Sequence, residues 1–275
     1  MTFWNSSLRA CWSALLLLIV LAGARADDPT RILLVATPPD HAYASHMYEF
    51  ECGVLAKCLE QTEGVTCETA VGWPPEPEEL ADLAAIVFYS RPAGEIVLHP
   101  DHREVFLDVM RKGAGFTAIH WATGVGYTEL ADEVEVRELY KNLLGGWFRR
   151  PPGGILYDTA RLRQVDPKHP LCFGWEEYDI HDEFYLDPVL HMRVRPILQV
   201  QVKDRDHTVA WSMDRPSPYE GRSVGISLGH FHKTFEREDF RRSLVNAILW
   251  TAKVDVPKAG APVALDPEDL QLPPQ

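Results

Sequence analysis

The sequence predicts an α/β protein built on a doubly wound, mostly parallel sheet, with an antiparallel strand excursion in its second half. Apolar runs without polar alternation, such as RILLVAT at 31–37, are typical of parallel strands that are buried on both faces. Segments with helical apolar spacing separate these runs in the first half of the chain. In the second half, strands follow one another with turn signals such as DRPSPYEGR between them, which favours antiparallel pairing.

The first half alternates strands with helices. Helices are expected at 45–61, where Phe50, Val54 and Cys58 are spaced four residues apart, and at 99–113, which has a similar apolar stripe. The expected strands are RILLVAT (31–37), VTCETAV (65–71), AAIVFYS (84–90) and GFTAIHWA (115–122). In such a sheet, ligands bind at the carboxyl ends of the strands.

The second half is richer in strands and ends in one long helix. That helix, 236–253, has Phe240, Leu244 and Ile248 at four-residue spacing. Residues 27–253 are therefore expected to form one α/β domain. Residues 254–275 are rich in proline and lack periodicity, so a mobile tail is expected there. The expected strands are ILYDTARLRQV, DIHDEFYL, ILQVQVK, HTVAWSM and SVGISL.

The first 26 residues resemble a secretory signal peptide. Arg9 precedes an apolar run at 14–22, and Ala24-Arg25-Ala26 has the pattern of a cleavage site. The mature protein would begin near Asp27 and be secreted or periplasmic. A retained membrane anchor is the alternative for this segment. No later segment is long and apolar enough to cross a bilayer, so no membrane span is expected after processing.

Charge and cysteine content restrict the partners and the redox chemistry. Removing residues 1–26 takes away Arg9 and Arg25 and no acid, which leaves 25 basic against 40 acidic residues and a net charge of −15. A nucleic-acid partner is therefore not expected. The even number of cysteines in the remaining chain permits disulfides, but buried free thiols are equally expected, so their pairing stays open. These cysteines are Cys52, Cys58, Cys67 and Cys172.

Several standard catalytic signatures are missing. The sequence has no GxGxxG after a strand, no P-loop and no HExxH. Dinucleotide binding, P-loop phosphoryl transfer and zincin chemistry therefore lose support.

Polar and aromatic side chains instead follow the expected parallel strands. Because the carboxyl ends of parallel strands meet at one edge of a sheet, these side chains should converge there. Any one histidine at a strand end is more often structural than catalytic, and His46 could simply begin a helix. Their joint placement is what indicates a site. The residues are His41 and Tyr43 after the first strand, Arg91 after 84–90, His120 and Trp121 at 115–122, and His230 and His232 after the last strand.

Three of these positions have a more specific expectation. If GHFHKTF at 229–235 continues its strand, alternation places His230 and His232 on one side and Phe231 on the other. His120 lies near the end of a buried strand, before a turn of small residues, where such sheets commonly present a reactive side chain. An imidazole there could act as a general base or bind a metal.

The segment IHDEFY at 180–185 is a second dense polar cluster. Alternation places His181 and Glu183 on one face of the strand and Asp182 on the other. Either carboxylate could be a general acid or base, or an oxygen ligand near the histidines. The competing interpretation is a solvated edge strand.

Aromatic and basic residues near these clusters would suit a carbohydrate ligand. Aromatic rings could form platforms for sugar rings, or could equally be ordinary core. Arg149 and Arg150 lie in a Gly- and Pro-rich loop that could bind a polyhydroxyl ligand or merely cross over. The aromatic candidates are Tyr43, Trp121, Trp147 and Tyr185.

The pattern resembles the trehalose-utilisation, or ThuA-like, family, whose fold is similar to that of class I glutamine amidotransferases. The resemblance spans roughly residues 31–253. It is carried by RILLVATPPDHAYASH, GAGFTAIHWA, LLGGWFRRPP, DPKHPLCFG with IHDEFY, TVAWSMDRPSPYEGRSVGISLGHFHKTF and FRRSLVNAILWTAK.

This resemblance implies a flavodoxin-like domain in which the amidotransferase cysteine has been lost, because His120 stands at the matching strand-to-helix junction. It also implies a polar pocket formed by His41, His120, Glu183 and His230, with His232 a weaker match. The family is associated with catabolism of trehalose and of keto-sugars. A keto-glycoside has acidic protons beside its carbonyl, which a base could remove while a histidine or a metal stabilises the enediolate.

The sequence therefore predicts an exported carbohydrate-active enzyme that acts on a glycoside or keto-sugar, with a small-molecule carbohydrate as its partner. The catalytic candidates are His120, Glu183 and His230, and the substrate-binding candidates are His41, Tyr43, Trp121, Asp182 and His232. Two or three imidazoles with Glu183 would suit zinc or another first-row ion, although spacing across separate segments leaves the metal open. The alternatives are a non-catalytic sugar-binding module and an amidotransferase-like hydrolase with a reactive thiol.

Overall fold

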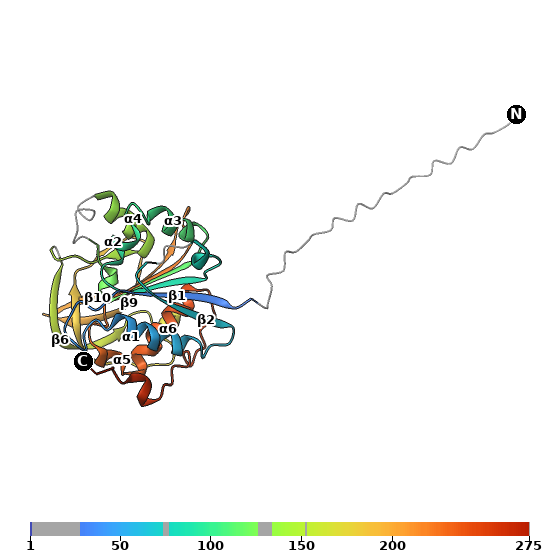
Figure 1. Ribbon diagram of the computed structural model, residues 1–275. Coiled ribbons are helices and arrows are strands. Elements are labelled where there is room, and N and C mark those ends of the chain that lie inside the picture. Colours follow the sequence, from blue (N-terminus) through green and yellow to red (C-terminus); the bar gives the residue numbers. More distant parts are fainter. Residues whose placement is uncertain (2–27, 74–76, 126–133, 152, 275) are drawn as a thin grey trace.

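The computed structural model describes Met1 and residues 28–73, 77–125, 134–151 and 153–274. Within these residues, nine strands form one mixed sheet in the order β2-β1-β3-β4-β11-β10-β9-β6-β7 (Figure 1). A two-stranded sheet pairs β5 (Gly146–Trp147) with β8 (Val189–Leu190). The predicted signal peptide lies, apart from Met1, outside the described residues.

One half of the large sheet is parallel and the other half is antiparallel. The parallel strands are β2 (Val65–Val71), β1 (Thr30–Ala36), β3 (Ala85–Tyr89), β4 (Gly115–Ile119) and β11 (Gly221–Ile226). The antiparallel strands are β10 (Arg205–Arg215), β9 (Arg195–Val202), β6 (Gly154–Gln164) and β7 (Tyr178–Leu186). This arrangement confirms the predicted fold class, including the antiparallel excursion.

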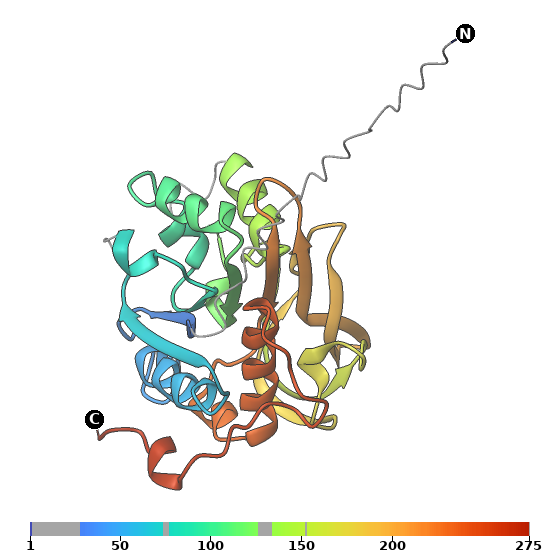
Figure 2. The same cartoon turned by 90° about the vertical axis from the view of Figure 1, so that its right-hand side faces the viewer.

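Helices cover both faces of the parallel half. Helices α1 (Tyr48–Leu59) and α6 (Glu238–Thr251) lie on one face, and α2 (Ala93–Val97), α3 (Arg103–Arg111) and α4 (Val134–Leu144) lie on the other (Figures 1 and 2). Every residue of β3 and β4 is buried, as expected for strands between two helical layers.

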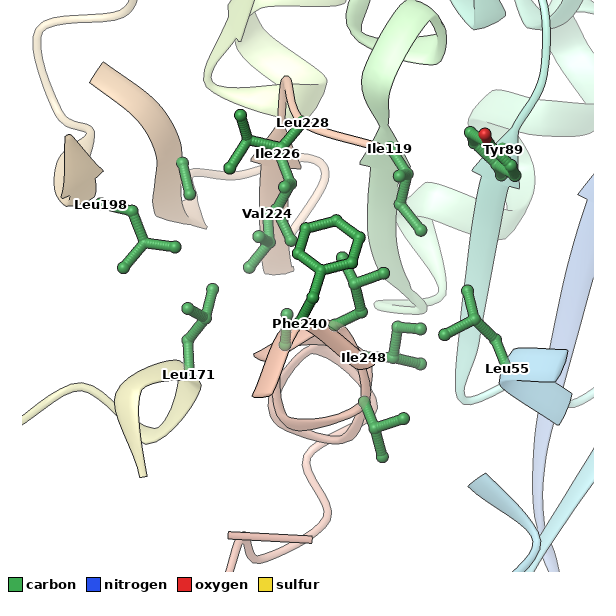
Figure 3. Packing of buried hydrophobic residues seen from close by; sticks show 14 of the residues in the cluster. Leu55, Tyr89, Ile119, Leu171, Leu198, Val224, Ile226, Leu228, Phe240 and Ile248 are labelled. Atoms are coloured by element: carbon green, nitrogen blue, oxygen red, sulfur yellow. The ribbon is translucent and has the colours of Figure 1, made fainter. Parts of the chain in front are cut away.

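Helix α6 shows why the apolar periodicity of the sequence was informative. Its Phe240 and Ile248 point into the core formed with Val224 and Ile226 of β11 (Figure 3). Burying each such side chain contributes roughly 1.5–3 kcal/mol to folding. The helix also lies so close to β4 that a Cβ on Gly115 would be 2.3 Å from the Thr251 carbonyl oxygen, so only glycine fits there.

Two of the element boundaries that differ from the predicted ones have a local cause in the backbone of a histidine. The helix expected from residue 45 begins at Tyr48, because His46 has a φ of 50°, outside the helical region. Strand β4 ends at Ile119 rather than at residue 122, because His120 has a φ of 54° and begins the short 3₁₀ helix η2 (His120–Thr123). Both departures occur at histidines.

The segment after Val254 is packed, which corrects the expectation of a mobile tail. Ala261 and Val263 are buried against the core between α1 and α6, and the Ala261 N–H donates to Asn246 Oδ1 at 2.9 Å. A short 3₁₀ helix, η5 (Pro267–Leu270), follows. Periodicity gave no signal because these residues pack one at a time on an extended backbone, without a repeating apolar face.

The cysteines of the described residues are free thiols. Burial raises the pKa of Cys52, raises that of Cys58 to about 11, and raises those of Cys67 and Cys172 to about 12. The structure therefore favours buried thiols over disulfides and activates none of the four. Among the described residues, no helix has the length and apolar character needed to cross a bilayer.

Candidate functional site

Four buried side chains meet at the carboxyl edge of the parallel strands. His46 lies between β1 and α1, His120 follows β4, His230 follows β11, and Glu183 lies on β7. Their exposed fractions are 1%, 0%, 3% and 5%. We call these four residues the His–Glu cluster.

The cluster is held by a set of short contacts. His120 Nε2 lies 3.0 Å from His46 Nε2 and 3.2 Å from His230 Nδ1. His46 Nε2 and His230 Nδ1 are 3.0 Å apart. Glu183 Oε2 lies 3.2 Å from His120 Nε2 and 3.3 Å from His230 Nδ1. The predicted convergence of His120, His230 and Glu183 is therefore seen in the structure.

His120 occupies a backbone position that few non-glycine residues adopt. A φ of 54° costs on the order of 1–3 kcal/mol and is found most often at functional sites. The position is stabilised by the Thr123 hydroxyl, which donates to the His120 carbonyl at 2.7 Å, and by Tyr185, whose ring stacks on the imidazole at 4.7 Å. His120 Nδ1 lies 3.1 Å from the Ser227 carbonyl oxygen. The imidazole is thereby fixed with Nε2 toward the cluster.

His46 is the functional candidate that sequence reasoning missed. The sequence leaves open that it simply begins a helix, and α1 does begin two residues later. Its left-handed φ turns the side chain into the cluster, and its backbone N–H donates to the His230 carbonyl at 3.0 Å. The only sequence signal was its place in the polar loop PPDHAYASH after the first strand.

Asp182 supports the cluster from outside and does not belong to it. Its carboxylate is fully buried and accepts from the backbone N–H groups of Gly229 at 2.7 Å and His230 at 3.0 Å. These bonds attach β7, an edge strand of the sheet, to the loop that presents His230. The sequence predicts Asp182 as a substrate-binding residue; in the structure its carboxylate accepts these backbone hydrogen bonds, which position His230. As predicted, it lies on the opposite face of β7 from Glu183.

The charges in the cluster are unevenly distributed. Burial by itself raises the pKa of Glu183, but the adjacent imidazoles of His120 and His230 outweigh it and hold that pKa well below its usual range. Burial, with the neighbouring imidazole of His120, lowers the pKa of His46 far below its usual range. The cluster therefore contains a carboxylate anion and at least one neutral imidazole.

His41 and Trp121 lie over the cluster, as predicted. The exposed His41 ring is 3.7 Å from the His46 ring, and its Nδ1 is 2.7 Å from Asp40 Oδ1. The Trp121 ring is 5.5 Å from His41 and 5.6 Å from His46. Tyr43 is exposed and its hydroxyl donates to the Pro273 carbonyl at 2.9 Å, so it faces the tail and not the cluster.

His232 lies apart from the cluster, contrary to the strand alternation expected for GHFHKTF. Strand β11 ends at Ile226, and His232 begins the short helix α5 (His232–Phe235). Its Nδ1 is 2.6 Å from Glu51 Oε1 and its Nε2 is 2.9 Å from the Leu270 carbonyl oxygen. The prediction from strand alternation is wrong because the chain leaves the sheet before it reaches either histidine.

Two tyrosines extend the site. Tyr157 lies opposite Glu183 in the β6–β7 register and is 53% exposed; its partial desolvation, with a hydrogen bond to Glu183, raises its pKa to about 12. Its role could not be seen in sequence because it depends on which strand pairs with β7. The hydroxyl of Tyr185, an expected aromatic platform, lies 3.3 Å from His120 Nε2. Trp147, the other buried platform candidate, packs in the core on the α3–α4 side of the sheet.

A cavity of about 290 Å³ opens at the same edge, where β1, β2 and β3 end. Thr37, Trp73 and Arg91 are among its lining residues. The Thr37 hydroxyl accepts from the Arg91 backbone N–H at 3.1 Å, which joins the first turn after β1 to the first turn after β3. The cavity has about the volume of a small-ligand site, and its lining surface is mainly apolar.

Among the described residues, no serine or cysteine is arranged as the nucleophile of a hydrolase. GISLG at 225–229 has the GxSxG spacing of a serine nucleophile, but the Ser227 hydroxyl donates to the Val209 carbonyl at 3.4 Å. Ser227 meets His120 through its backbone carbonyl and not through its hydroxyl. The buried thiols described above are not activated either, which removes support for the amidotransferase-like alternative.

Comparisons with known proteins agree with this fold. Residues 40–251 match the family described as ThuA, trehalose utilisation. A search of curated proteins found no significant match. A structure described as a ThuA-like protein from Bacteroides uniformis is 19% identical, covers 86% of this chain and 97% of its own, and superposes with a TM-score of 0.62.

Two further structures extend the likeness. One described as a ThuA-like protein from Parabacteroides merdae is 13% identical, covers 90% of this chain and 100% of its own, and has a TM-score of 0.60. A cytoplasmic protein from Salmonella typhimurium LT2 is 13% identical, covers 80% and 99% of the two chains, and has a TM-score of 0.58. At these identities the likeness concerns the fold alone.

Proposed function

The chain belongs to the ThuA family of trehalose utilisation, and we propose that it is an exported enzyme that acts on a glycoside or keto-sugar. The family supports a role in sugar metabolism. The chemistry is proposed from the site: His120, His230 and Glu183 would act on protons and developing negative charge beside a sugar carbonyl, while His41 and Trp121 would contact the ring.

The observation that carries this proposal is the contact of one buried carboxylate with two imidazoles at the carboxyl edge of the sheet. A proton on the carbon beside a ketone is acidic because its loss gives an enediolate. A positioned imidazole can take that proton, and an adjacent carboxylate stabilises the imidazolium that forms. Isomerisation, elimination or glycoside cleavage can each follow from the enediolate.

Proton NMR with a 3-keto-glycoside in deuterated buffer tests the proposal. We expect exchange at the carbon beside the ketone, or a new product, with the wild-type protein and with His181→Ala, an exposed histidine on β7 that lies outside the cluster. His120→Ala should lose the activity. Binding of unaltered sugar without exchange or product would contradict catalysis and support the sugar-binding module.

Export is proposed from the sequence of residues 1–26. Expression of the full-length chain in a bacterial host, with mass spectrometry of the product, should detect a mature protein beginning near Asp27 outside the cytoplasm. An uncleaved chain that stays in the cytoplasm or in the membrane fraction would contradict export.

A further inference from the structure

The inward-facing atoms of the His–Glu cluster have the arrangement of a ligand set for a metal ion. His46 Nε2, His120 Nε2, His230 Nδ1 and a Glu183 carboxylate oxygen all lie within 4.8 Å of one another. Five contacts among them measure 3.0–3.3 Å. Four buried donor atoms from four separate segments thus share one centre.

The hydrogen bonds behind two of the rings direct lone pairs into that centre. The Ser227 carbonyl can only accept, so His120 Nδ1 carries a proton and its Nε2 presents a lone pair. His46 Nδ1 is 3.1 Å from Asp40 Oδ1 and 2.6 Å from the Tyr48 hydroxyl, which itself reaches the same carboxylate. This chain ends in an acceptor, so it favours a proton on His46 Nδ1. The two Nε2 lone pairs then face each other at 3.0 Å.

Without an ion, these short contacts would have to be hydrogen bonds, each with a proton between its two atoms. His230 Nδ1 can donate one hydrogen bond and the Tyr185 hydroxyl can donate another to His120 Nε2. Only the first of these donors serves one of the five contacts, and the contact of His120 Nε2 with Glu183 Oε2 still joins a lone pair to an anion. The competing state is a metal-free cluster with an imidazolium at His120. Metal-binding measurements distinguish that state from a metal centre.

The distances also fit coordination. Ligands about 2.0–2.1 Å from a tetrahedral zinc ion lie roughly 3.3 Å from one another. The five contacts of 3.0–3.3 Å are close to that spacing. Asp40 behind His46, Ser227 behind His120 and Tyr157 behind Glu183 supply the outer hydrogen bonds that orient metal ligands.

We propose that the His–Glu cluster binds one divalent first-row transition ion, with Zn²⁺ as its representative, through three imidazole nitrogens and one carboxylate oxygen. Imidazole with a single carboxylate, and no thiolate, is a donor set suited to such ions. Asp40 is then a positioning residue for His46. The proposal does not depend on the sugar substrate, because binding of the ion is measured without turnover.

An ion in this place would supply Lewis-acid stabilisation of an enediolate oxygen. With the ion bound, the lone pairs of the three imidazoles would be engaged. The cluster would then act on developing negative charge, and the proton transfer assigned above to one of its imidazoles would fall to groups outside the ligand set. His41, whose ring lies 3.7 Å from that of His46, and Tyr157, which is hydrogen-bonded to Glu183, are such groups.

Metal binding by the full chain, purified without a polyhistidine tag, tests the proposal. After removal of metal with a chelator, titration with Zn²⁺ should show about one site per folded chain. Asp40→Asn should weaken the affinity about 10–100-fold through the outer hydrogen bond. Glu183→Gln and His46→Ala should weaken it further, whereas His181→Ala should match the wild type.

Two results would overturn the proposal: no stoichiometric binding by the folded wild type, or equal affinity in wild type, Glu183→Gln and His46→Ala. Should the ligand variants fail to fold, Co²⁺ bound to the wild type decides the matter. Intense visible bands of a four-coordinate ion are expected, and the weak spectrum of a six-coordinate surface ion would contradict the assignment. Zinc binding without sugar turnover would refute the proposed function and leave the metal site standing.

Discussion

Two histidines only two residues apart have opposite surroundings. His232 is a paired residue: one ring nitrogen faces the Glu51 carboxylate and the other faces the Leu270 carbonyl. His230 is a converging residue, because its Nδ1 faces two other imidazole nitrogens and a carboxylate oxygen. Complementary pairing stabilises a fold, whereas convergence of lone pairs requires an ion, a proton or a substrate to complete it. The comparison separates structural from functional histidines more sharply than burial does, since both are buried.

The largest expected contrast is between the two carboxylates of these regions. Glu183→Gln removes the anion that contacts His120 and His230, so turnover of a keto-sugar should fall about 10²–10⁴-fold. Glu51→Gln should leave turnover near the wild-type value, because Glu51 contacts only His232 of the two histidines compared here. Steady-state kinetics of both variants measure this, and comparable losses in the two would remove the distinction.

Stability should respond in the reverse order. His232→Ala leaves the Glu51 carboxyl buried without its imidazole partner, which should lower the free energy of unfolding by about 3–5 kcal/mol. His120→Ala should cost less, because it removes one of the crowded lone pairs. Urea denaturation of the two metal-free variants gives both values. A greater loss in His120→Ala would show that the cluster, too, is mainly structural.

The Glu51 pair should also make stability depend on pH. Burial raises the pKa of Glu51 to about 7 in the folded state, against an ordinary value near 4.5. A raised folded pKa contributes stability that is present below the unfolded pKa and lost as pH rises through the folded one. The free energy of unfolding should therefore fall by on the order of 2 kcal/mol between pH 5 and 8. Urea denaturation across this range should show a shallower slope for Glu51→Gln, and an unchanged slope would exclude Glu51 as the cause.

The smallest expected effect comes from the tail. Deleting residues 267–275 removes the Leu270 carbonyl that accepts from His232 Nε2, which should cost about 1 kcal/mol. Thermal denaturation of the truncated chain should show this loss, with keto-sugar exchange unchanged. A truncation that abolishes exchange while the chain stays folded would mean that the tail serves the site, through Tyr43 and Pro273 for example.

The fold could be predicted from sequence because strand and helix patterns are local. The limits of β2 coincide with the expected VTCETAV, and the apolar spacing of α6 gives its buried face. The strand-end rule also brought His120 and His230 to one edge. These inferences need only periodicity and the parallel order of the strands.

The features that sequence patterns did not predict depend on long-range geometry or on single backbone angles. His46 enters the cluster through a left-handed φ that no residue pattern announces, and Tyr157 enters through the pairing of β6 with β7. His232 lies outside the cluster because β11 ends at Ile226, so strand alternation does not extend to it. The tail was missed because its buried residues contact α1 and α6 without a repeat.

Deuterium exchange into a 3-keto-glycoside, compared for His230→Ala and His232→Ala, tests the central claim most directly. The two substitutions are chemically identical and two residues apart, so differences report on the surroundings alone. We expect His230→Ala to lose exchange at the carbon beside the ketone and His232→Ala to keep it, at a temperature where both variants are folded. Equal exchange in the two variants, or loss in His232→Ala alone, would contradict the assignment of the His–Glu cluster as the reactive centre.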